Sequence, residues 1–66
     1  MDQNVINSVF SHATKGRKIL FGHSNNGRVK VKIKYGPLGL LTTRYATDHE
    51  TFNEIKRRLK ISGLLN

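Results

Sequence analysis

Basic and apolar residues alternate without a break along one segment in the middle of the chain, RVKVKIKY, residues 28–35. Its even-numbered positions are Arg28, Lys30, Lys32 and Lys34, and its odd-numbered positions are all apolar or aromatic. Successive side chains on a β-strand point to opposite faces of the sheet. The alternation therefore predicts a strand with one buried face and one cationic face.

The segments on either side of it also have the composition of strands, and we expect them at about residues 17–24 and 40–46. The first connection sets the register, since a two-residue turn would place Phe21 opposite Lys32. A three-residue turn, residues 25–27 with Gly27 in the left-handed conformation, pairs apolar residues instead. We predict this turn and the following pairs across it: Phe21 with Val31, Ile19 with Ile33, and His23 with Val29.

Beyond the GPLG turn, the same alternation assigns the side chains of the third strand to one face or the other. The residues expected on the apolar face are Leu41, Thr43 and Tyr45. The residues expected on the cationic face are Thr42 and Arg44.

A helical periodicity precedes the strands, over about residues 3–14. Asp2 could cap the start of this helix, and Gly16 is suited to end it. The apolar residues that recur on one face of this helix are Val5, Ile6, Val9, Phe10 and Ala13.

A second helix is expected over about residues 48–61, where TDHE has the spacing of a capping box with Thr47 as the N-cap and Glu50 reaching back. Gly63 fits the position just past this helix, with Leu64 or Leu65 folding back. The apolar seam of this helix consists of Phe52, Ile55 and Leu59.

These elements predict one small α+β domain spanning residues 1–66, in the order α-β-β-β-α. We expect a three-stranded antiparallel sheet with both helices packed on one face, which leaves the other face exposed and basic. The cations predicted on that face are Lys18, Arg28, Lys30, Lys32, Lys34 and Arg44.

The charge composition supports the prediction of a basic face. The chain has twelve Lys and Arg but only four Asp and Glu, which gives a net charge of +8. Residues 3–47 contain eight of the basic residues and no acidic one. Like charges opposite each other destabilise a sheet, and a merely solubilising surface mixes both signs. The pattern favours a face that binds a polyanion over one that is only solvated.

The position of the aromatic residues favours duplex over single-stranded nucleic acid. Phe21, Tyr35 and Tyr45 fall on the apolar face, so no ring is expected on the basic face for bases to stack on. Arg28 and Arg44 are the best candidates to read base edges, while the lysines suit phosphates. Asn25 and Asn26 are further candidates, although turn chemistry alone also explains them.

In outline, residues 17–60 resemble the sheet-plus-helix DNA-binding domains of plant ethylene-response factors and the arm-binding domains of phage integrases. The resemblance is one of architecture, without a shared sequence motif. It implies that the sheet enters the major groove of DNA.

Three smaller features each have two interpretations. Lys56, Arg57 and Lys60 could contact phosphates, or could complement the helix dipole beside a Glu54–Arg58 pair. In KGRK, Lys15 and Arg17 could contact phosphates or simply form a loop. In PLGLL, Leu41 could be core and Leu38 could cover the sheet edge; alternatively Leu38, with Leu64 and Leu65, could form a protein contact or a homodimer surface.

The residue types that are absent or scattered argue against a metalloprotein, an enzyme or a membrane protein. There is no cysteine, the three histidines lack ligand spacing, and no nucleophile–base arrangement is visible, so we expect no metal, no cofactor and no enzymatic activity. No signal peptide or membrane span is evident, and we expect a cytoplasmic or nucleoid-associated protein.

The sequence thus predicts a small DNA-binding protein, such as a regulator, a recombination accessory protein or an architectural factor. One alternative is an inhibitor or adaptor that docks its basic face on an acidic or nucleic-acid-mimicking protein. Another is a binder of structured RNA or of the ribosome.

Overall fold

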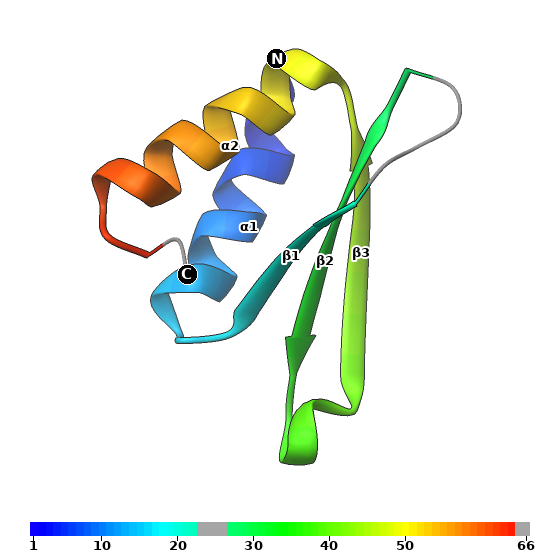
Figure 1. The fold of residues 1–66 in the computed structure, drawn as a ribbon, viewed down its shortest axis with the longest axis vertical. Coiled ribbons are helices and arrows are strands. Elements are labelled where there is room, and N and C mark those ends of the chain that lie inside the picture. Colours follow the sequence, from blue (N-terminus) through cyan, green and yellow to red (C-terminus); the bar gives the residue numbers. More distant parts are fainter. Residues whose placement is uncertain (23–26, 65–66) are drawn as a thin grey trace.

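The computed structural model describes residues 1–22 and 27–64 and confirms the predicted order α-β-β-β-α (Figure 1). Both helices cover one face of an antiparallel sheet whose strand order is β1-β2-β3, so the opposite face is open. A short 3-10 turn separates the last two strands. The elements are α1 (Gln3–Thr14), β1 (Lys18–Gly22), β2 (Val29–Tyr35), η1 (Pro37–Gly39), β3 (Leu41–Thr47) and α2 (His49–Ile61).

The register of the first hairpin is the predicted one. Phe21 pairs with Val31 and Ile19 pairs with Ile33, and Gly27 has a φ of 70°. Apolar residues therefore meet across the two strands on the helix side of the sheet. Four residues with predicted roles lie outside the described residues: His23, the predicted partner of Val29, the turn residues Asn25 and Asn26, and Leu65.

The core lies between the central strand and the two helices. Each buried Val, Ile or Leu side chain contributes about 1.5–3 kcal/mol relative to exposure, which makes this cluster the main stabilising element. The sheet aromatics Phe21, Tyr35 and Tyr45 pack around its rim. The buried residues of the cluster are Ile6, Val9, Ala13, Val31, Ile33, Ile55 and Leu59.

Both helices end in the same glycine-dependent way. After α1, Gly16 takes a φ of 77° and its N–H donates to the Ala13 carbonyl at 3.0 Å. After α2, Gly63 takes a φ of 71°, and the N–H of Leu64 donates to the Leu59 carbonyl at 2.8 Å. This motif satisfies the last helical carbonyls and folds Leu64 back onto the core, as predicted.

The predicted cap of α2 is wrong by one residue. The N-cap is Asp48, whose carboxylate accepts a hydrogen bond from the Thr51 N–H at 2.9 Å. Thr47 instead remains in β3, paired with Val29 and fully buried, so its side chain is not available to cap the helix. Thr51 then links the two helix starts, because its hydroxyl accepts from the Asp2 N–H at 2.8 Å.

The β2–β3 hairpin extends past the helix layer, toward the bottom of Figure 1. The interpretation of Leu41 as core and Leu38 as a cover for the sheet edge is therefore wrong. Leu41 has the predicted parity, opposite Tyr35, but it is 51% exposed since it lies on this projecting part. Leu38, in the turn, is 94% exposed.

No helix within the described residues is both long and apolar enough to cross a membrane.

Candidate nucleic-acid interface

The open face of the sheet is defined by the strand register. Val29, Val31 and Ile33 point toward the helices and are buried, so their neighbours along β2 point the other way. The outward positions form three rows across the sheet: Lys18–Lys34–Thr42, Leu20–Lys32–Arg44 and Gly22–Lys30–Ala46. We call these positions the cationic face; they bring together five of the six predicted cations.

Within the cationic face, like charges stand directly opposite each other. Lys18 is the partner of Lys34, and Lys32 is the partner of Arg44. Facing pairs of this kind repel and cost roughly 0.2–1 kcal/mol each, unless an anion lies between them.

No acid of the chain lies on a strand to offset this repulsion. Asp2 caps α1 and Asp48 caps α2, while Glu50 and Glu54 lie on α2. Glu54 takes part in both ion pairs found among the described residues. The acidic side chains are thus confined to the helices and their caps, and none of them lies among the cations of the cationic face.

The remaining residues of this face are small or apolar. Gly22 and Ala46 flank Lys30, and a half-buried Leu20 flanks Lys32. Sequence reasoning missed Leu20 and Gly22, although alternation from Lys18 along β1 would have placed both here. A hollow on this face is lined by Leu20, Phe21, Gly22, Lys30, Lys32 and Arg44.

The sheet aromatics have the parity of the helix-facing side and pack against the core, although Phe21 also borders the hollow. The Tyr35 hydroxyl lies 3.1 Å from Thr43 Oγ1, and the Phe21 ring meets Phe52 edge-on at 5.2 Å between centroids. No aromatic ring occupies any of the nine outward positions on β1, β2 and β3. This part of the sheet therefore offers charge but no platform on which bases could stack.

The predicted cations next to the strands have different surroundings. Arg28 is exposed just before β2, and its Nη2 donates to the Ala46 carbonyl at 3.3 Å. Arg17 lies on the helix side, with its guanidinium 4.6 Å from the Tyr35 ring centroid and Nη1 2.7 Å from His12 Nδ1. Lys15 is the exposed C-cap of α1. Arg17 is thus held within the fold rather than displayed on the cationic face.

The basic cluster on α2 is partly neutralised. The predicted Glu54–Arg58 pair is present, with Nε 2.8 Å from Oε1, and Arg57 also donates to Glu54. These two guanidinium groups lower the pKa of Glu54 to about 2. Lys56 Nζ lies 5.3 Å from the Phe52 ring centroid, and Lys60 is exposed in the last turn.

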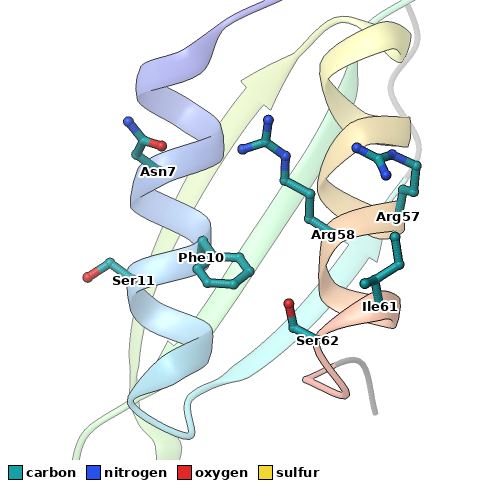
Figure 2. A pocket seen from close by; sticks show the side chains of 7 residues that line it. All are labelled: Asn7, Phe10, Ser11, Arg57, Arg58, Ile61 and Ser62. Atoms are coloured by element: carbon teal, nitrogen blue, oxygen red, sulfur yellow. The ribbon is translucent and has the colours of Figure 1, made fainter.

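A groove also runs between the two helices on the far side of the molecule from the cationic face. Figure 2 shows α1 and α2 as its two walls, with Phe10 at its floor and Arg58 reaching across from α2. Arg57 and Arg58 are both engaged by Glu54, so the groove adds little free charge. Its lining consists of Asn7, Phe10, Ser11, Arg57, Arg58, Ile61 and Ser62.

Comparison of the chain with protein-family models, with curated proteins and with solved structures found no match. The function proposed below therefore rests on the cationic face itself.

Proposed function

We propose that this protein binds duplex DNA through the cationic face of its sheet. The observation that supports the proposal is the set of five cations on the open face of the sheet, with facing like charges and no acid on any strand. A phosphate backbone would place anions between those cations and release the counterions condensed on the DNA.

Duplex DNA fits this face better than a single strand does. Phosphate contacts need only exposed cations, which the face has, whereas sequence-tolerant binding of single strands relies on aromatic stacking. A sheet of this size can lie in the major groove. Because Gly22 and Ala46 are small, the phosphate backbone of the DNA could then approach Lys30 closely.

Within this face we assign different roles to lysine and arginine. The flexible ammonium groups of Lys18, Lys30, Lys32 and Lys34 suit phosphates. The planar guanidinium of Arg44 can hold guanine O6 and N7 together and is the best candidate for base reading. A selection from random duplexes that enriches no sequence would contradict the role of Arg44.

The test compares two variants that each remove three of the eight net positive charges. The sheet variant, K30Q/K32Q/K34Q, changes only the cationic face. The helix variant, K15Q/K56Q/K60Q, changes exposed lysines of the helix layer. Glutamine keeps most of the aliphatic stem, so neither variant opens a gap in the packing.

Binding is measured by fluorescence anisotropy of a labelled random duplex at about 0.1 M salt. Relative to 1 M salt, each phosphate contact contributes about 0.9 log unit of affinity at about 0.1 M, so loss of three contacts should weaken binding by about 2.7 log units. The helix variant should stay within a few-fold of the wild type. Equal losses in both variants would show that net charge, and not this face, governs binding.

Two further experiments, competition by an RNA duplex and capture of an acidic protein, separate this proposal from its alternatives. An RNA duplex that displaces the DNA at lower concentration would indicate a structured-RNA or ribosomal target. An absence of duplex binding, together with sheet-dependent capture of an acidic protein, would indicate the inhibitor or adaptor class. We further propose a cytoplasmic or nucleoid-associated location, where duplex DNA would be accessible.

A further inference from the structure

The tip of the β2–β3 hairpin is the most exposed apolar feature of the described chain. The hairpin projects past both helices (Figure 1), so no other element covers its turn. Leu38 is 94% exposed and Leu40 is 76% exposed, next to Pro37. Apolar side chains gathered at such a position commonly mark an interaction site.

The backbone holds this tip in one defined shape. The Gly39 N–H donates to the Gly36 carbonyl at 3.0 Å, and the Leu40 N–H donates to the Pro37 carbonyl at 3.3 Å. Gly36 and Gly39 take φ values of 78° and 66°, as glycine readily does. The turn is therefore preorganised, with Pro37 and Leu38 at its end.

Leu38 itself adopts a φ of 58°, the left-handed region that a residue with a Cβ atom rarely occupies. It is the one non-glycine residue with positive φ in residues 1–22 and 27–64. Burial of the side chain does not offset this backbone strain, because the side chain lies almost wholly in solvent. Strained, exposed residues of this kind occur at sites shaped for a ligand.

The tip is continuous with the cationic face. The row Lys18–Lys34–Thr42 is separated from the turn only by the pair Tyr35–Leu41. Lys32 lies three residues before the end of β2, so the turn begins about 10 Å beyond the centre of the face. The tip therefore projects beyond the cationic face, beside the DNA that this face would bind.

We propose that the hairpin tip inserts Leu38 between adjacent base pairs and kinks the duplex that the cationic face binds. Leucine and proline are among the side chains that act as wedges in the minor groove. The inference rests on the proposed function, because the cationic face delivers the tip to the DNA. It predicts a bent duplex, whereas contacts from the cationic face alone would leave it straight.

The test measures energy transfer between dyes at the two ends of a short duplex saturated with protein. The wild type should raise the transfer by an amount that corresponds to a kink of about 20–90°. Leu38→Asn removes the apolar wedge with a residue that tolerates left-handed φ, and it should bind with the same salt dependence while leaving the duplex straight. Ile61→Asn is the control, since Ile61 is 72% exposed but lies at the end of α2, and it should bend DNA like the wild type.

Fluorescence of 2-aminopurine placed within the duplex reports the same event locally. Unstacking by the wedge should raise it for the wild type and for Ile61→Asn but not for Leu38→Asn.

Each other outcome rejects the wedge in a distinguishable way. A wild type that binds without bending, or a Leu38→Asn variant that bends equally, overturns the wedge and leaves the proposed function standing. Absence of duplex binding by the wild type overturns both. If Leu38→Asn instead abolishes binding to anionic phospholipid vesicles and leaves DNA bending unchanged, the tip is a lipid contact and the inference is wrong.

Discussion

Arg17 is a cation whose charge is used inside the fold, between Tyr35 and His12. Burial lowers the pKa of His12 below its ordinary value of 6.5, and the positive charges of Arg17 and Lys15 lower it further. A neutral imidazole can accept the hydrogen bond from Arg17, whereas an imidazolium would repel it. The contact between Arg17 and His12 therefore depends on pH.

This dependence predicts the pH profile of stability. Because the folded pKa of His12 is the lower one, the unfolded state binds more protons just below pH 6.5. Its contribution to the free energy of unfolding should be full above about pH 6.5, fall as the pH drops through that value, and level off below the folded pKa.

Urea unfolding of the wild type and of His12→Gln between pH 5 and 7.5 measures this effect. The variant should show a flatter profile, since its amide accepts from Arg17 at every pH. His49→Gln, at an exposed position in the first turn of α2, should keep the wild-type profile. Identical profiles for His12→Gln and the wild type would contradict the assignment.

At the scale of an element, the sheet combines a favourable face with an unfavourable one. Its helix-facing side buries apolar residues, while its other side sets Lys18 opposite Lys34 and Lys32 opposite Arg44. A strand can carry such repulsion because burial of Val31 and Ile33 outweighs it.

Lys34→Glu should therefore stabilise the protein, because it converts the facing Lys18 pair from repulsive to attractive. We expect a gain of about 0.2–1 kcal/mol in the free energy of unfolding by urea at low salt, and weaker binding to DNA. Lys60→Glu makes the same charge change in the last turn of α2, where an acid opposes the helix dipole, and it should lose stability. A loss of stability in Lys34→Glu would mean that the facing lysines do not repel significantly.

The accuracy of sequence prediction also differs between elements for physical reasons. Strand parity and register followed from alternation, since any slip would bury lysine. The α2 cap could not be predicted, because it depends on whether Thr47 is the last paired residue of β3, which tertiary packing decides. Two further features also depend on tertiary structure. The exposure of Leu41 depends on how far the β2–β3 hairpin extends past the helices, and the position of Arg17 depends on its contact with Tyr35.

At the scale of the whole molecule, the acidic side chains and the cations of the cationic face lie in different layers. The helix layer carries all four acids as caps, first-turn charges or ion-pair partners, and the sheet carries five unopposed cations on its open face. Electrostatic steering by this face would orient the protein as it approaches a polyanion, and raised salt would weaken it. Under the proposed function, the cationic face therefore lowers stability and provides the binding surface.

The slope of log K against log salt for duplex binding tests this account most directly. Four phosphate contacts from the lysines of the cationic face predict a slope of about −3.6 for the wild type. The sheet variant K30Q/K32Q/K34Q should flatten it to about −1, and the helix variant K15Q/K56Q/K60Q should leave it unchanged. A wild-type slope flatter than about −2, or equal flattening by both variants, would contradict the claim that the cationic face binds the DNA.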